Sequence, residues 1–208
     1  MNKRYLIIGG VVFALVALTA WGVYRNPERQ LEPVMNLINA TNQEMRGFLI
    51  ANQTCFGDES LKNRESAKCV VELQKIRDYF QTQDKENIAK LEIYFQENGS
   101  RLDNDTRSVI ENSLKLNKSQ AYADLGLAYD QYFGAYIEWH KYFRDVVGIK
   151  GVDNMTTEEL MRTKTLAQNV VDAEENLQLK INALSDYLRE NFDKEFVDAV
   201  SAQTGSRI

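Results

Sequence analysis

Proline is confined to the start of this 208-residue chain, at Pro27 and Pro33, and only eleven glycines occur. Because proline interrupts helices and glycine weakens them, the long remainder of the chain can form uninterrupted helices. An all-β fold would need many turns rich in these two residues. The sequence therefore predicts an all-α protein, long enough for one sizeable domain.

An apolar run without a charged residue precedes both prolines, from Tyr5 to Tyr24. At about 1.5 Å per residue, a helix of this length spans a hydrocarbon core of about 30 Å. Lys3 and Arg4 stand before the run, which favours a cytoplasmic N-terminus. We interpret residues 5–24 as a transmembrane anchor and residues 1–4 as a short cytoplasmic tail.

The apolar run has an alternative interpretation as a secretory signal that is removed after export. Cleavage after Ala20 would place Leu18 three residues before the cut, where a small residue is preferred, and the run exceeds the usual ~7–15 residues. We therefore expect a retained anchor in a bacterial inner membrane, with the main domain in the periplasm. A secreted or periplasmic protein and a eukaryotic type II membrane protein stay open as alternatives.

Cys55 and Cys69 are the two cysteines of the chain, and both lie beyond the apolar run. An even pair in an exported domain indicates a disulfide, which adds up to ~3 kcal/mol for a loop of this size. Two unpaired buried thiols are the alternative. No Cys-x-x-Cys or Cys/His spacing points to a metal site, so we expect no metal.

Beyond Lys3 and Arg4 the chain holds 23 basic and 30 acidic residues, a net charge of −7. No basic run rises above this acidic background. The sequence therefore argues against nucleic acid and anionic lipid headgroups as partners of the main domain. The expected membrane contact is the single span.

Periodicity and stop signals predict four helices after a Pro-containing linker at residues 25–33. The helices are expected from Glu32 to Gln53, from Ser66 to Glu97, from Asp105 to Val147, and from a capping box at Thr156 and Glu159 to about Val200. Short connections favour antiparallel neighbours. We predict an elongated antiparallel four-helix bundle over residues 34–203, followed by a C-terminal tail at 204–208.

Apolar residues of the expected last helix repeat at heptad spacing, which is typical of coiled-coil packing. One seam holds Leu160, Ala167, Ile181 and Leu188, and its companion holds Val170, Leu177 and Leu184. Glu174 falls on the first seam. Either the register slips there or a buried polar contact accommodates the carboxylate, and we expect the slip.

Residues 128–143, "AYDQYFGAYIEWHKYF", hold seven aromatic residues and the only histidine. Most of the rings share an arc of about 120° on a helical wheel, which is typical of a core-facing helix. The stripe extends beyond the expected end of its neighbouring helix, where the disulfide-closed loop with Phe56 is the available cover. We predict an incompletely covered aromatic core and a partner or ligand patch made of Tyr132, Tyr136, Trp139, His140, Tyr142 and Phe143.

The single histidine limits the chemistry of this chain. A di-iron bundle needs two Glu-x-x-His motifs, whereas His140 is the only histidine and Ile137 stands at the glutamate position. No Gly-x-Ser-x-Gly elbow, P-loop or dinucleotide glycine motif occurs. We expect no enzyme activity, no catalytic residue and no cofactor, and we interpret His140 as a hydrogen-bonded core residue.

Asn-x-Ser/Thr occurs six times, which would make glycosylation acceptors in a eukaryotic secretory context. The six asparagines are Asn39, Asn52, Asn98, Asn104, Asn117 and Asn154. Helix starts and turns are also rich in asparagine, serine and threonine, and we favour this as the explanation for the six motifs.

Three functions stay open on this basis. The leading one is a non-enzymatic, membrane-anchored adaptor, scaffold or accessory subunit that binds another envelope protein or itself. The alternative is a ligand-binding or sensor module that takes a small molecule at the aromatic stripe. The third is a glycosylated type II surface protein.

Overall fold

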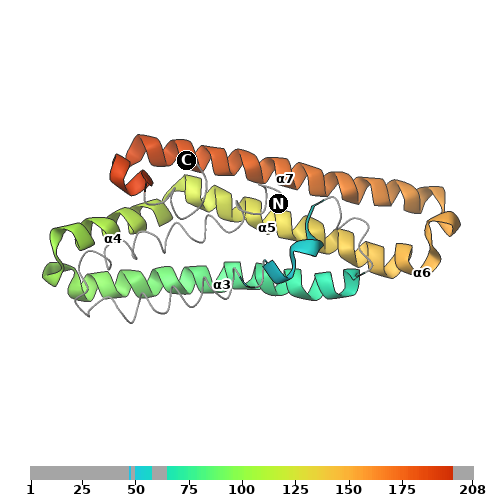
Figure 1. Ribbon diagram of the computed structural model, residues 1–208, viewed down its shortest axis with the longest axis horizontal. Helices are drawn as coiled ribbons and strands as arrows, with labels where there is room; N and C mark the ends of the chain where they lie inside the picture. Colours follow the sequence, from blue (N-terminus) through green and yellow to red (C-terminus); the bar gives the residue numbers. More distant parts are fainter. Residues whose placement is uncertain (1–46, 48–49, 58–64, 199–208) are drawn as a thin grey trace. The chain divides into compact units, whose positions relative to one another are not determined.

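The computed structural model describes residues 47, 50–57 and 65–198, and these contain helices and no strand (Figure 1). The elements are η1 (Gln53–Cys55), α3 (Ser66–Asn98), η3 (Gly99–Arg101), α4 (Asn104–Asn117), α5 (Gln120–Tyr142), the π-helical η4 (Phe143–Val147), α6 (Gly148–Lys150), η5 (Val152–Asn154) and α7 (Thr157–Asn191). The predicted all-α class is confirmed for this part of the chain, which is compatible with a helical bundle.

Several predicted segments lie outside the described residues. They are the anchor at 5–24, the linker at 25–33, the tail at 204–208 and most of the expected first helix. Among the helices that the structure does describe, none combines the length and the apolar character needed to cross a membrane. The anchor and the four-helix count therefore stay predictions.

The chain divides into two compact units. Of the described residues, the first unit holds residue 47, Phe80–Ala123 and residues 183–198. The second unit holds residues 50–57, 65–79 and Asp124–Asn182. Helices α3, α5 and α7 each contribute residues to both units.

In the first unit, α4 runs back beside the second half of α3 (Figure 1). Their shared core contains Leu91, Ile110 and Leu114, with Tyr94, Phe95 and Leu102 partly buried around it. The Lys118 ammonium lies 2.6 Å from the Glu92 carboxylate. Lys115 of α4 donates to the carbonyl of Asn191, the last residue of α7, at 3.0 Å and lies 4.8 Å from the ring centre of Phe192.

The single helix predicted from Asp105 to Val147 is wrong, because the chain breaks between α4 and α5. The Ser119 hydroxyl accepts from the Tyr122 amide at 3.2 Å, which is an N-cap for α5. The same hydroxyl donates to the Leu116 carbonyl at 2.6 Å, so one serine satisfies backbone groups of both helices. The α-helical pattern then widens to a π-helix at Phe143–Val147.

In the second unit, polar pairs link α5 antiparallel to α3 and to α7. Arg77 of α3 makes a bidentate ion pair with Asp130 of α5, with N···O distances of 2.6 and 2.8 Å. Lys180 of α7 contacts Asp124 of α5 at 2.9 Å. Towards the C-terminal end of α5, its contact residues on α3 and on α7 have lower residue numbers. Helix α5 is therefore antiparallel to both helices.

Both heptad seams of α7 face the core. Val170, Leu177 and Leu184 of the companion seam are 3 %, 4 % and 5 % exposed, and Leu188 of the first seam is 1 % exposed. Ala167 and Ile181 are half-buried, whereas Leu160, near the start of the helix, is 44 % exposed.

Candidate functional site

The predicted disulfide between Cys55 and Cys69 is confirmed, with the two Cα atoms 5.4 Å apart. Both cysteines are buried. Cys69 belongs to the first turn of α3, so the bond ties residues 52–57, here called the cap segment, to that helix. Covalent closure of such a loop restricts the unfolded chain.

Phe56 of the cap segment covers the aromatic stripe of α5. Its ring stacks on Tyr132 with centroids 5.7 Å apart and meets Tyr136 edge-on at 5.5 Å. It also lies edge-on to Phe133 at 6.1 Å. Stacked and edge-to-face pairs are the favourable geometries for aromatic rings. The side chain is 2 % exposed, so the cap segment closes this part of the core.

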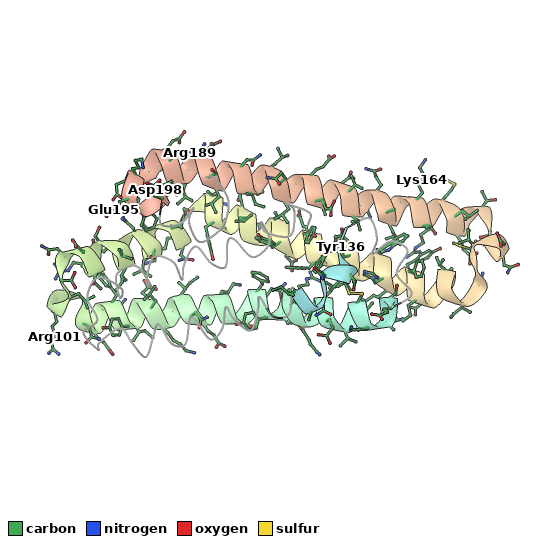
Figure 2. All side chains as sticks on the ribbon, in the orientation of Figure 1. Arg101, Tyr136, Lys164, Arg189, Glu195 and Asp198 are labelled. Carbon is green, nitrogen blue, oxygen red and sulfur yellow. A yellow bond between two sulfur atoms is a disulfide. The ribbon has the colours of Figure 1, made fainter. Side chains whose placement is uncertain are left out.

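The Tyr136 hydroxyl connects the cap segment to α7 (Tyr136 is labelled in Figure 2). It accepts from the Gly57 amide at 2.6 Å and donates to Glu174 Oε1 at 2.7 Å. Burial, and then the bond to Glu174, raise the pKa of Tyr136 well above its ordinary value. The polar contact, and not the expected register slip, accommodates Glu174. Gly57 adopts a φ of +75°, which glycine allows without strain.

His140 is fully buried and bonded at both ring nitrogens. Nε2 lies 3.1 Å from the Cys55 carbonyl oxygen, and Nδ1 lies 3.2 Å from the Ser66 hydroxyl. A carbonyl only accepts, so Nε2 carries the hydrogen, and Nδ1 accepts from Ser66 in the neutral ring. Burial lowers the pKa of His140, with the bond to Cys55 opposing it. These contacts agree with the interpretation of His140 as a hydrogen-bonded core residue.

The structure buries most of the predicted patch. Tyr132, Tyr136, Trp139 and His140 are at most 4 % exposed, whereas Tyr142 and Phe143 are half-buried. The accessible part of the patch therefore reduces to its last two residues. A role of these residues in binding a partner or ligand stays a prediction.

Trp139 holds a buried donor without an acceptor. Its side chain is 3 % exposed and lies beside Phe143, with ring centroids 6.1 Å apart. Its indole nitrogen has no hydrogen-bond partner within the described part of the chain. A buried polar group in this state costs free energy that a bound acceptor would recover.

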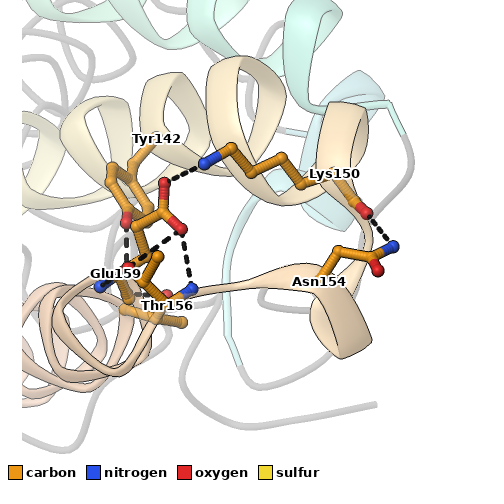
Figure 3. A network of polar contacts seen from close by, with 6 residues as sticks. Tyr142, Lys150, Asn154, Thr156 and Glu159 are labelled. Atoms are coloured by element: carbon orange, nitrogen blue, oxygen red, sulfur yellow. Dashed lines mark hydrogen bonds and ion pairs between the residues drawn. The ribbon is translucent and has the colours of Figure 1, made fainter.

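Residues 148–156, here called the α6–α7 turn, are held by a polar network (Figure 3). The predicted capping box is confirmed, since the Thr156 amide donates to Glu159 Oε2 at 2.9 Å and the Glu159 amide donates to the Thr156 hydroxyl at 3.2 Å. Lys150 pairs with the other carboxylate oxygen of Glu159. These bonds, first the one from Lys150, lower the pKa of Glu159.

Two further contacts fix the same turn. The Tyr142 hydroxyl donates to the Glu159 carbonyl at 3.1 Å, and the Asn154 amide donates to the Lys150 carbonyl at 2.9 Å. Gly151 reverses the chain at a φ of +71°. The turn is therefore held to the end of α5 and to the start of α7.

This turn presents two aliphatic side chains to solvent. Ile149 is 77 % exposed and Val152 is 61 % exposed, on either side of Lys150 and Gly151. Sequence reasoning missed both residues, because it used this stretch only as a helix stop. The available signal was two aliphatic residues inside a glycine-containing polar turn, where nothing in the local pattern required them.

The described residues contain no group of three or more His, Cys, Asp or Glu side chains that could hold a metal ion. Comparison with protein-family models, with curated proteins and with solved structures gives no match to the chain. Function is therefore inferred from the residues themselves.

Proposed function

We propose that this protein is a non-enzymatic, membrane-anchored adaptor or accessory subunit of a cell-envelope complex. It contacts another envelope protein through the α6–α7 turn. The observation that carries the proposal is the pair of exposed aliphatic residues, Ile149 and Val152, on a turn that several hydrogen bonds hold in place.

A turn that hydrogen bonds keep ordered binds a partner at a lower cost in conformational entropy than a flexible loop. Association costs free energy when side chains and loops must become ordered, and preorganisation lowers that cost. Here the Gly151 amide donates to the Val147 carbonyl at 2.9 Å and the Met155 amide donates to the Val152 carbonyl at 3.2 Å, so the backbone that carries Ile149 and Val152 is already ordered. Burial of two such aliphatic residues contributes about 1.5–3 kcal/mol each.

The compartment follows from two features of the chain. The apolar run from Tyr5 to Tyr24 has the length of a membrane span, and the Cys55–Cys69 disulfide suits an oxidising space such as the periplasm. We place the helical domain there as an elongated antiparallel four-helix bundle on a single-pass anchor. Retention of the protein in membranes washed at alkaline pH tests the anchor.

Photocrosslinking in native membranes tests the partner contact. A photoreactive residue at Ile149 or at Val152 is expected to capture the same protein in stoichiometric amount. Leu127 of α5, which is 64 % exposed, is the matched control position and should not capture it. Equal capture from all three positions, or no capture at all, contradicts the proposal.

Substitution supplies the second arm of this test. Ile149→Ser combined with Val152→Ser should lose the captured protein at least about tenfold in mild-detergent purification, because about 1.4 kcal/mol corresponds to tenfold. Leu127→Ser should retain it. Both variants should unfold at the wild-type temperature, since all three side chains are exposed.

The specific observation that favours a ligand-binding module is the unpartnered indole of Trp139. A small molecule with a carbonyl or carboxylate acceptor would satisfy that donor and stabilise the folded state by mass action. Thermal-shift screening tests this second candidate. Trp139→Phe keeps an aromatic ring but removes the N–H, so it should abolish any shift that depends on the indole.

Fewer of the Asn-x-Ser/Thr asparagines are accessible to glycosylation than the sequence suggested. Asn104 and Asn154 are exposed, whereas Asn52 is buried. Asn98 and Asn117 are half-buried, and their side-chain amides donate to the Tyr94 and Ser113 carbonyls. The glycoprotein candidate therefore depends on Asn104 and Asn154 among the described positions, and a glycosidase mobility shift tests it.

A further inference from the structure

Helix α7 carries apolar residues on two opposite sides within the second unit. Val170 and Leu177 are buried on one side. At about 100° per residue, three exposed apolar residues lie outside this buried stripe, two of them opposite it and Val171 about a quarter turn from it. They are Met161, Val171 and Leu179, which are 67 %, 40 % and 65 % exposed.

Three charged residues lie on the same side, which we call the outer face of α7: Met161, Lys164, Val171, Asp172, Glu175 and Leu179. The Asp172 carboxylate accepts a hydrogen bond from the Gln168 side-chain amide at 2.8 Å. Lys164, labelled in Figure 2, and Glu175 are both exposed. Neither forms an ion pair among the residues that the structure describes. The outer face therefore offers one cation and one anion that no described neighbour satisfies.

The positions on the outer face are symmetric about one point. Met161 and Leu179 are five helical turns apart, and the point midway between them is residue 170. Lys164 and Glu175 are about three turns apart, and their midpoint falls between residues 169 and 170. Val171 stands next to both midpoints.

This symmetry is what a two-fold interface requires. When two copies of one surface meet about a two-fold axis, residue i contacts residue j of the other copy and j contacts i. With antiparallel helices and the axis near residue 170, each Met161 faces the other copy's Leu179. Each Lys164 then faces a Glu175, and the two Val171 side chains meet beside the axis.

We propose that a second copy of this chain docks antiparallel on the outer face of α7 to form a two-fold dimer. Charge complementarity selects this occupant, because the same face supplies both the cation and the anion at matching distances from the axis. The paired aliphatic residues supply the buried apolar area. The dimer is independent of the partner contact proposed for the α6–α7 turn, since Ile149 and Val152 take no part in it.

Charge reversal on the full-length chain in detergent tests the dimer, with sedimentation equilibrium as the readout. Wild type should associate reversibly as a dimer. Lys164→Glu and Glu175→Lys should each weaken association about tenfold, because each replaces two attractive pairs by repulsive ones. These variants change the net charge in opposite directions, so an equal effect excludes a net-charge cause.

Mixing supplies the decisive control. In a mixed dimer of Lys164→Glu and Glu175→Lys chains, both cross-dimer pairs are again opposite in charge, so an equimolar mixture should regain wild-type affinity. The double variant K164E/E175K should regain it as well. A monomeric wild type, or single variants that dimerise as tightly as wild type, overturns the proposal.

Cross-linking tests the direction of the helices. Chains with Met161→Cys and chains with Leu179→Cys, mixed and treated with a short bismaleimide, should link to each other and not to their own kind. Self-linking of either variant indicates parallel helices and overturns the proposal. The variants also separate the two interfaces, because Ile149→Ser/Val152→Ser should still dimerise and Lys164→Glu should still bind the envelope partner.

Discussion

Nε2 of His140 lies 3.1 Å from the carbonyl oxygen of Cys55, so the only histidine of the chain binds the backbone of a half-cystine. The other ring nitrogen lies 3.2 Å from the Ser66 hydroxyl at the start of α3. One imidazole of α5 therefore holds both segments that the disulfide joins. Covalent and hydrogen-bonded links converge on the same cap segment.

Stability should fall in mild acid because of His140. Burial lowers the pKa of His140 in the folded protein, whereas a histidine in the unfolded chain titrates near ~6.5. As the pH falls below ~6.5, the unfolded chain binds a proton that the folded protein does not. The free energy of unfolding should then decrease by up to about 1.4 kcal/mol per pH unit, and it should be flat above about pH 7.5.

His140→Gln tests this dependence by urea unfolding between about pH 5 and pH 7.5. The variant should be less stable than wild type at neutral pH, because the amide cannot reproduce both ring contacts. It should also lose the decrease that titration of the imidazole causes. The same slope in the variant would assign the pH dependence to other groups.

Removal of the disulfide should lower stability by about 3 kcal/mol, as expected for a closed loop of this length. Cys55→Ser combined with Cys69→Ser leaves no unpaired thiol and is the appropriate variant. Its urea midpoint should match that of wild-type protein reduced with a dithiol. A loss near zero would mean that the hydrogen bonds of His140 and Gly57 hold the cap segment without the covalent link.

Phe56→Ala should cost about 3–5 kcal/mol, because the ring is buried between the tyrosines of α5 and its loss leaves a cavity. Ile50→Ala in the same part of the chain is the matched control. Ile50 is 61 % exposed, so its loss should change the free energy of unfolding by less than about 0.5 kcal/mol. Equal losses would contradict the assignment of Phe56 as the cover of the stripe.

Tyr136→Phe should destabilise the protein by about 1–3 kcal/mol, because it leaves the Gly57 amide and the Glu174 carboxylate without this partner. Glu174→Gln keeps an acceptor oxygen and should cost less. In a double-mutant cycle, Tyr136→Phe and Glu174→Ala should be non-additive, since both remove this hydrogen bond. Additive losses would show that the bond does not contribute.

Gly151→Ala and Gly126→Ala should change stability in opposite directions. A Cβ would meet nothing within 4 Å at either residue, so backbone conformation decides the sign. Gly151 has a φ of +71°, and alanine there should cost about 1 kcal/mol. Gly126 is exposed within α5, where alanine should stabilise by about 0.5–1 kcal/mol. Stabilisation by both would contradict the left-handed turn. Thermal unfolding measures both.

Local patterns predicted the starts of two long helices but missed the break at Ser119 and the end of α7, which lies at Asn191 and not near Val200. The start of α3 at Ser66 and the capping box at Thr156 and Glu159 follow from residue type and spacing, and the structure has both. The break at Ser119 was missed, although a serine three residues before Tyr122 can cap a helix. Such a serine is equally common within a helix, so its neighbours must decide whether it acts as a cap.

The candidate site was only partly predictable. The aromatic periodicity of α5 indicated a core-facing helix, and an even cysteine pair in a chain expected to be exported indicated a disulfide. The loop with Phe56 was expected to cover the stripe, but neither pattern indicated which ring Phe56 would stack on or that the Cys55 carbonyl would meet His140. The exposed Ile149 and Val152 were also missed, because exposure is a property of the folded molecule.

By itself the sequence determined the helical class and the disulfide pair, because helix periodicity and the pairing of two cysteines depend on residue type and spacing. Tertiary structure alone decided that Glu174 meets Tyr136 instead of forcing a slip, and that Leu160 is exposed while Leu188 of the same seam is buried. Leu160 and Leu188 satisfy the same heptad rule. Which of them is buried depends on the neighbouring side chains, and those contacts form only when the helices pack.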